Sequence, residues 1–131
     1  MKWMEQAKLL LDKAAQDEFV ADKLLADPDS PVEAIGFSLQ QAAEKIIKAA
    51  LSFREIPYPR THDLGLLIGL LQDNKVKVPS EFEDFGELSP FAVELRYTLV
   101  PGQFGAVGEL DLKEARELIR KLRKWVEEMD K

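Results

Sequence analysis

The sequence predicts an all-α fold, a single-domain antiparallel helical bundle of about five helices with an up-and-down four-helix core. Apolar residues recur at helical spacing in each long segment between turn signals. Proline, aspartate, serine and glycine cluster between these segments, as expected for short connections. The one stretch that resembles a strand, KVKVP at 75–79, is too short and isolated to form a sheet. At 131 residues with 46% hydrophobic residues, the whole chain, 1–131, is expected to form one domain.

The first helix is predicted from about Lys2 to Leu25, with Lys and Asp on its outer side. The turn sequence DPDSP ends it, because proline cannot continue a helix and aspartate and serine favour turns. Its buried stripe is expected to contain Trp3, Ala7, Leu10, Leu11, Ala14, Ala15, Phe19, Ala21 (or Val20), Leu24 and Leu25.

The second helix is predicted to be central, because it is apolar around most of its circumference. Ser30 is the expected N-cap, with Pro31 in the first helical position and Glu33 completing a capping box. The helix must end before Pro57, since a residue preceding proline avoids helical geometry. Its apolar stripe comprises Ile35, Leu39, Ala42, Ile46, Ala49 and Phe53, widened by Ala43, Ile47, Ala50 and Leu51.

Three further helices are expected. Thr61 should cap a helix from His62 to about Asn74. Ser80 and Glu83 should open the next, with Phe82, Phe85 and Leu88 facing inward and a continuation over Phe91 to Leu99 after a kink or restart at Pro90. A Gly-rich loop at 102–108 precedes the last helix, Leu112 to about Met129.

The composition restricts the function classes. The formal net charge of −6 argues against broad binding to nucleic acid, which needs a basic face. The absence of cysteine excludes disulfides and cysteine-based zinc sites. Apolar runs are too short for a membrane span, and the N-terminus is too acidic for a targeting peptide. We therefore expect a cytoplasmic protein with no cofactor and no metal.

A narrow polar strip on the second helix asks for an explanation beyond packing. Gln41, Glu44, Lys45, Lys48 and Ser52 recur there at helical spacing. One interpretation is a buried network of hydrogen bonds and salt bridges that joins two helices. The other is that Lys48 and Gln41 line a groove, with Glu44 beside them, and contact a phosphate.

Three segments carry a family resemblance. QQAAEKIIKAAL, PRTHDL and ELRYTLVPG, within about 34–102, resemble the HEPN family. This resemblance implies a HEPN-like helical bundle that often forms a homodimer. It also implies a minimal nucleotidyltransferase (MNT-type) as partner, in a two-component or toxin–antitoxin system.

The resemblance further implies that Arg96 contacts phosphate. In many HEPN proteins four to six residues separate this arginine from a histidine, and that pair is associated with metal-independent RNA cleavage. Here Pro101, Gly102 or Gln103 would have to serve, and none can transfer a proton near neutral pH. We therefore expect a catalytically degenerate site in which Gln103 only donates hydrogen bonds. The alternative for Arg96 is an ion pair between helices.

His62 is the only histidine, and Arg60 lies two residues before it. In the first turn of a helix, the dipole would disfavour the imidazolium form of His62. A structural hydrogen bond or a polar contact beside the phosphate pocket is expected, and a metal site is not. Arg60 is either solvated or a third cation for the ligand.

Three functions remain open at this point. The favoured one is an interaction protein with a nucleotide- or RNA-phosphate-binding groove formed by Arg96, Lys48, Gln41 and Gln103. The second is an endoribonuclease toxin in which His62 replaces the missing histidine. The third is a purely structural dimerisation or adaptor bundle.

Overall fold

The computed structural model describes residues 2–88 and 112–130, and these residues are all helical or in connections. The elements are α1 (Lys2–Ala26), α2 (Val32–Phe53), α3 (Leu64–Asp73), η1 (Ser80–Leu88), α6 (Leu112–Glu127) and η2 (Glu128–Asp130). The all-α prediction is confirmed, and 76–79 form a connection rather than a strand. Among the described helices, none combines the length and apolar character that crossing a bilayer requires.

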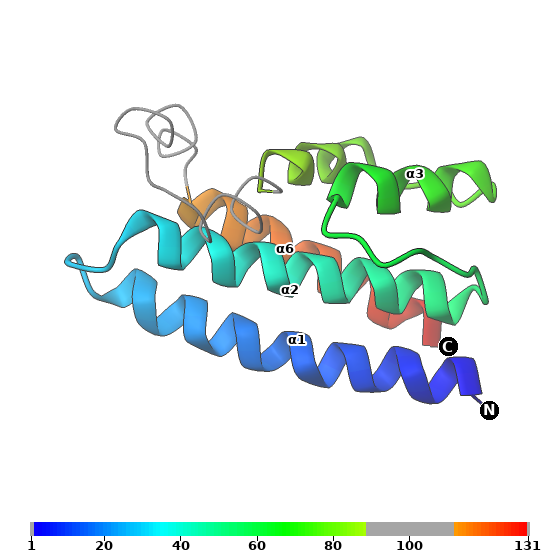
Figure 1. Ribbon diagram of the computed structural model, residues 1–131, viewed down its shortest axis with the longest axis horizontal. Helices are drawn as coiled ribbons and strands as arrows, with labels where there is room; N and C mark the ends of the chain where they lie inside the picture. The colour runs from blue at the N-terminus through cyan, green and yellow to red at the C-terminus, as the bar shows by residue number, and fades with distance from the viewer. Residues whose placement is uncertain (1, 89–111, 131) are drawn as a thin grey trace.

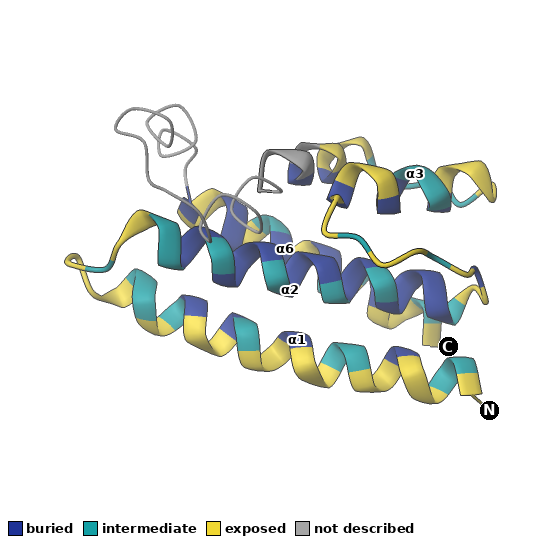
Figure 2. Cartoon of the chain, in the orientation of Figure 1, coloured by how far each residue is buried: buried dark blue, intermediate teal, exposed yellow. Residues whose placement is uncertain are grey.

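Helix α2 is the central helix, as predicted. Helix α1 runs antiparallel along one side of it, α6 covers another side, and α3 with η1 covers a third (Figure 1). The start of α6 lies beside the end of α1, where Arg116 contacts Asp22. Asp130 of η2, which directly follows α6, lies near the start of α1, with its Oδ2 atom 3.9 Å from Lys8 Nζ. Burial is accordingly densest on α2 (Figure 2).

Small side chains set the packing of α1. Ala7, Ala14 and Ala21 recur every seven residues, and each is fully buried. The seven-residue repeat keeps one face of α1 against its neighbours along the whole helix. This face is narrower than the predicted stripe, so the prediction was wrong for Ala15, which is exposed, and for Phe19, which is 62% exposed. Phe19 instead lies beneath the ammonium group of Lys23, 5.3 Å from the ring centre.

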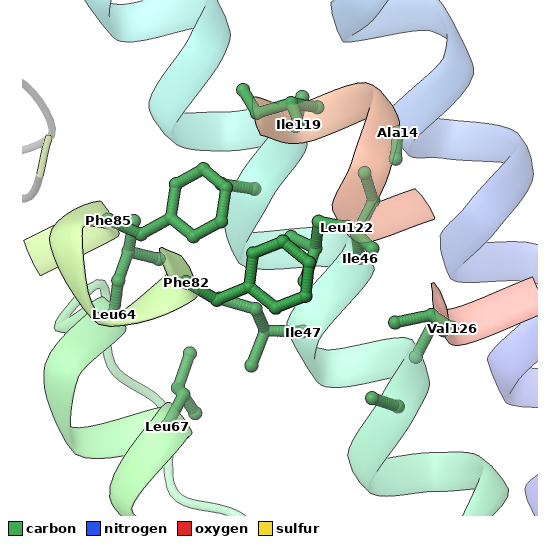
Figure 3. Close-up of a cluster of buried hydrophobic side chains, with 14 of the residues drawn as sticks. Ala14, Ile46, Ile47, Leu64, Leu67, Phe82, Phe85, Ile119, Leu122 and Val126 are labelled. Carbon is green, nitrogen blue, oxygen red and sulfur yellow. The ribbon is translucent and has the colours of Figure 1, made fainter. Parts of the chain in front are cut away.

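The core on the side of α2 that faces away from α1 is rich in aromatic residues. Phe82 and Phe85 of η1 point between α3 and the α2–α6 pair (Figure 3), and their ring centres are 5.9 Å apart. Trp125 of α6 lies 5.6 Å from Phe82. The segment is a 3₁₀ helix, in which residues three apart share one side, so both phenylalanines face inward as predicted. The predicted continuation, Phe91 to Leu99, and the Gly-rich loop lie outside the described residues.

Two helix starts differ from the predictions. Helix α2 follows Pro31 as N-cap without a side-chain cap, so the Ser30 capping box does not form. At α3 the N-cap is Asp63, whose Oδ1 accepts a hydrogen bond of 3.1 Å from the backbone N–H of Leu66. Thr61 accepts instead from the N–H of Asp63. The predicted cap was therefore wrong by two residues, and His62 lies before the helix rather than in its first turn.

A buried ion-pair cluster joins α1 to α6, and no sequence pattern pointed to it. Arg116 is 7% exposed and binds both carboxylate oxygens of Asp22, at 2.6 and 3.0 Å, and one of Glu18, at 3.3 Å. The Arg116 hydrogen bonds outweigh the effect of burial and hold the pKa of Asp22 below its ordinary value. Arg123 binds the other oxygen of Glu18 and the backbone carbonyl of Leu11.

The alanine face of α1 can be tested with two adjacent substitutions. Ala14→Leu forces a larger side chain into a closed interface and should destabilise the protein by about 1–3 kcal/mol. Ala15→Leu places the same side chain in solvent on the same helix and should change stability by less than about 0.5 kcal/mol. Urea unfolding of both variants measures the difference, and equal effects would contradict the assigned face.

The ion-pair cluster yields a second stability prediction. Arg116→Met should destabilise the protein by about 3 kcal/mol, because it leaves the buried Glu18 carboxylate with fewer partners. Arg120→Met is the control, since the side chain of Arg120 is 51% exposed and its pair with Asp22 spans 3.8 Å. Urea unfolding in parallel measures both, and a cost at Arg116 no larger than at Arg120 would contradict a structural role for the cluster.

Candidate functional site

The connector between α2 and α3, residues 54–63, runs back along the polar strip of α2. In the structure, the polar residues on this face of α2 differ from the predicted strip, because Gln40 takes the place of Gln41 and Lys45 lies elsewhere. The strip as observed consists of Gln40, Glu44, Lys48 and Ser52, spaced four residues apart. Tyr58 of the connector lies over Lys48, whose Nζ is 5.7 Å from the ring centre. Gln6 of α1 ties this region together by bonding both the Tyr58 hydroxyl, at 2.9 Å, and Ser52 Oγ, at 3.2 Å.

Glu44 is the centre of the site. It is only 5% exposed, and its carboxylate accepts hydrogen bonds from Gln40 Nε2 at 2.9 Å, Lys48 Nζ at 2.9 Å and His62 Nδ1 at 2.8 Å. Burial raises the pKa of Glu44, but these three hydrogen bonds and the Lys48 charge outweigh burial and hold that pKa below its ordinary value. Glu44 is therefore an ionised carboxylate at neutral pH.

The state of Glu44 determines the tautomer of His62. An ionised carboxylate only accepts hydrogen bonds, so the proton in the 2.8 Å contact belongs to His62 Nδ1. In the neutral imidazole, Nε2 then carries the lone pair. The side chain of His62 is 44% exposed, and its backbone carbonyl accepts a hydrogen bond of 3.3 Å from Gln40. The ring is thus held at one nitrogen and open to solvent at its other side.

Of the two interpretations of the polar strip, a buried network of hydrogen bonds and salt bridges is the one that fits Glu44 and Lys48. Lys48 is bound to Glu44, and the Glu44 carboxylate is enclosed by its donors. Gln40, which was not predicted as a site residue, is fully buried and bonds both Glu44 and the backbone carbonyl of His62. Gln41 instead donates to Gln40 Oε1 at 2.6 Å. Lys45 lies on another side of α2 and pairs with Asp17 of α1 at 2.5 Å.

The remaining predicted site residues divide into two groups. Arg60 is exposed in the connector and forms no ion pair with any carboxylate of the described residues. Arg96 and Gln103 lie outside the described residues. Within 2–88 and 112–130, no group of three or more histidine, aspartate or glutamate side chains is arranged to hold a metal ion.

A separate hollow of about 280 Å³ lies between the start of α1 and the end of α2. Two charged and four uncharged residues line it. The charged residues are Lys2 and Glu55, and the uncharged ones are Trp3, Met4, Ser52 and Phe53. Only Ser52 connects it to the polar strip, through Gln6 and the Lys48 carbonyl. It therefore lies at the Ser52 end of the strip, about two helical turns from Glu44 and its contact with His62.

The comparison with known protein families now bears on this site. The sequence matches the HEPN domain family over residues 2–129. The chain belongs to the HEPN domain family. No curated protein matches the chain, and no solved structure matches it. In this HEPN domain, the two segments QQAAEK and PRTHDL, far apart in sequence, meet at the contacts of Gln40 and Glu44 with His62.

The lowered pKa of Glu44 predicts a pH dependence. In the folded state the pKa of Glu44 lies below its ordinary value, so the ionised carboxylate stabilises the fold at neutral pH, and this contribution is lost as pH falls through the folded-state pKa. The stability difference between wild type and Glu44→Gln should therefore shrink as pH falls from about 7 to about 3. Urea unfolding across this range measures it, with the exposed Glu81→Gln as control. A constant difference between wild type and Glu44→Gln would contradict the assignment.

Proposed function

We propose that this HEPN domain binds the phosphate of a nucleotide or of RNA beside the His62 ring, without cleaving it. Family membership supports a nucleotide- or RNA-related function. The observation that carries the proposal is the imidazole of His62, which Glu44 fixes at Nδ1 while its other side is open to solvent. Arg60, two residues away and exposed, supplies a cation that no carboxylate of the described residues neutralises.

The charges of the site assign different roles to its cations. Lys48 and Glu44 neutralise one another, so Lys48 positions the carboxylate and contributes little net field to a ligand. A phosphate would be met by the Arg60 guanidinium, which can bind two oxygens at once, and by the imidazole in its doubly protonated form, in which Nε2 donates a hydrogen bond. In this proposal Arg96 and Gln103 add further contacts. A small site of this kind is consistent with a net charge of −6, which disfavours a long nucleic-acid surface.

The partner part of the proposal follows from the family resemblance. We propose a cytoplasmic homodimer that associates with a minimal nucleotidyltransferase, in a two-component or toxin–antitoxin system. The ligand phosphate would then be one that the partner also recognises. Co-purification of the chain with any minimal nucleotidyltransferase encoded beside it, and light scattering of the complex, test this part.

An endoribonuclease is the second candidate, and one observation favours it. The Glu44–His62 pair has the arrangement of a base and its orienting carboxylate, so His62 is a candidate to take the proton of a ribose hydroxyl. Incubation of RNA with wild type and with Arg96→Ala separates the candidates. Cleavage that Arg96→Ala abolishes would establish the enzyme, whereas equal, negligible cleavage is the result that the binding proposal expects.

Calorimetric titration with ATP tests the binding proposal directly. Arg60→Ala and Arg96→Ala should each weaken ATP binding by roughly tenfold, the effect of losing one charge-assisted hydrogen bond. Arg54→Ala is the matched control, because Arg54 is also exposed but lies at the end of α2. No heat from wild type at millimolar ATP would overturn the proposal and favour a purely structural bundle.

A further inference from the structure

We propose that Nε2 of His62 is a phosphoryl acceptor, which forms a phosphorus–nitrogen bond with a small phosphoryl donor. This inference rests on the proposed function, because the opening beside His62 must admit a phosphate for the reaction to occur. It goes further by assigning a covalent step to one atom. The relevant donors are small molecules whose phosphoryl group has a good leaving group, such as a phosphoramidate, an acyl phosphate or a nucleoside triphosphate.

The first argument is the nucleophilicity of Nε2. An imidazole attacks phosphorus only through a nitrogen that carries a lone pair. The 2.8 Å hydrogen bond to Glu44 keeps the proton on Nδ1 and therefore leaves the lone pair on Nε2. Because the His62 side chain is 44% exposed, the ring is open to solvent. Histidine nucleophiles oriented by a third group in this way are an established means of covalent transfer.

The second argument is the charge that develops in the reaction. When Nε2 bonds to phosphorus, the ring becomes formally cationic, and the Glu44 carboxylate already contacts Nδ1. A carboxylate in this position stabilises the positive charge of the phosphorylated ring by direct electrostatic interaction. The second oxygen of Glu44 remains bound to Lys48 at 2.9 Å, so the carboxylate is held in place throughout. The charged product is thus stabilised without rearrangement of the cluster.

The third argument is the rigidity and surroundings of the ring. Gln40 fixes the backbone carbonyl of His62, and Asp63 caps α3 immediately after it, so both sides of the residue are anchored. Glu44 contacts the ring and Lys48 contacts Glu44, while Arg60 and Asp63 are the charged residues next to His62 in the connector sequence. Arg60 is exposed and can meet the incoming phosphoryl oxygens.

The step balances with phosphoramidate as donor. The lone pair of Nε2 forms the new bond to phosphorus, and the phosphorus–nitrogen bond of the donor breaks. The leaving nitrogen departs as ammonia with the three protons that it carries in the zwitterionic donor. The proton on Nδ1 stays in the hydrogen bond to Glu44, so no general base is required. No oxidation or reduction takes place.

The test uses the full chain and potassium phosphoramidate, with phosphorus NMR as readout. The chain has a single histidine, so any phosphohistidine signal is unambiguous. The expected result is one acid-labile product at Nε2, absent from His62→Gln. Glu44→Gln should slow its formation by roughly tenfold, the effect of replacing one charge-assisted hydrogen bond by a neutral one. Product at Nδ1, or an unchanged rate in a folded Glu44→Gln protein, would overturn the proposal.

A measurement on the wild type alone guards against misfolding of the Glu44 variant. Long-range nitrogen NMR of the neutral ring should show the tautomer protonated at Nδ1, whereas the Nε2-protonated tautomer would overturn the proposal. Parallel reactions with acetyl phosphate and ATP identify the donor. ATP binding without modification by phosphoramidate would overturn the acceptor role and leave the proposed binding intact. Modification without ATP affinity would overturn only the proposed binding.

Discussion

The burial of one carboxylate, that of Glu44, determines the path of the connector between α2 and α3. An ionised carboxylate that is 5% exposed is tolerated only when hydrogen bonds replace its hydration. Two of its donors, Gln40 and Lys48, come from the same helix, one turn before and one turn after it. The third, His62, comes from the connector. This requirement draws the connector back along α2 and thereby sets where α3 begins.

The protein contains a second buried carboxylate, Glu18, and the comparison separates structure from chemistry. Glu18 is satisfied by Arg116 and Arg123, and both arginines are largely buried and bind further acceptors. That cluster therefore has little capacity for a ligand and serves to join α1 to α6. At Glu44 one donor is an imidazole that uses a single nitrogen and lies partly in solvent. Chemistry is therefore expected at the Glu44 cluster and not at the Glu18 cluster.

Features that repeat along a helix could be predicted from the sequence. Contacts between residues that are distant in the sequence could not. The apolar circumference of α2 identified the central helix, and the polar strip with Glu44, Lys48 and Ser52 was visible at helical spacing. Gln40 was missed in favour of its neighbour Gln41, because only the path of the connector decides which glutamine faces His62. Arg116 and Glu18 are 98 residues apart, so no local pattern shows that they pair. Phe19 looked buried because hydrophobic character, rather than the alanine repeat, was used to place the face of α1.

The error at the start of α3 has the largest functional consequence. With Thr61 as cap, His62 would lie in the first turn of a helix, where the dipole disfavours a charged ring. With Asp63 as cap, the ring lies outside the helix and its electrostatic environment is set by Glu44. A group bound to Nε2 then acts on the same ring whose Nδ1 proton holds the connector to α2. Occupancy of that nitrogen and stability of the connector are linked, because a ligand that binds the ordered site stabilises it by mass action. In the proposed function, a phosphate bound at this ring would therefore also alter the anchoring of α3.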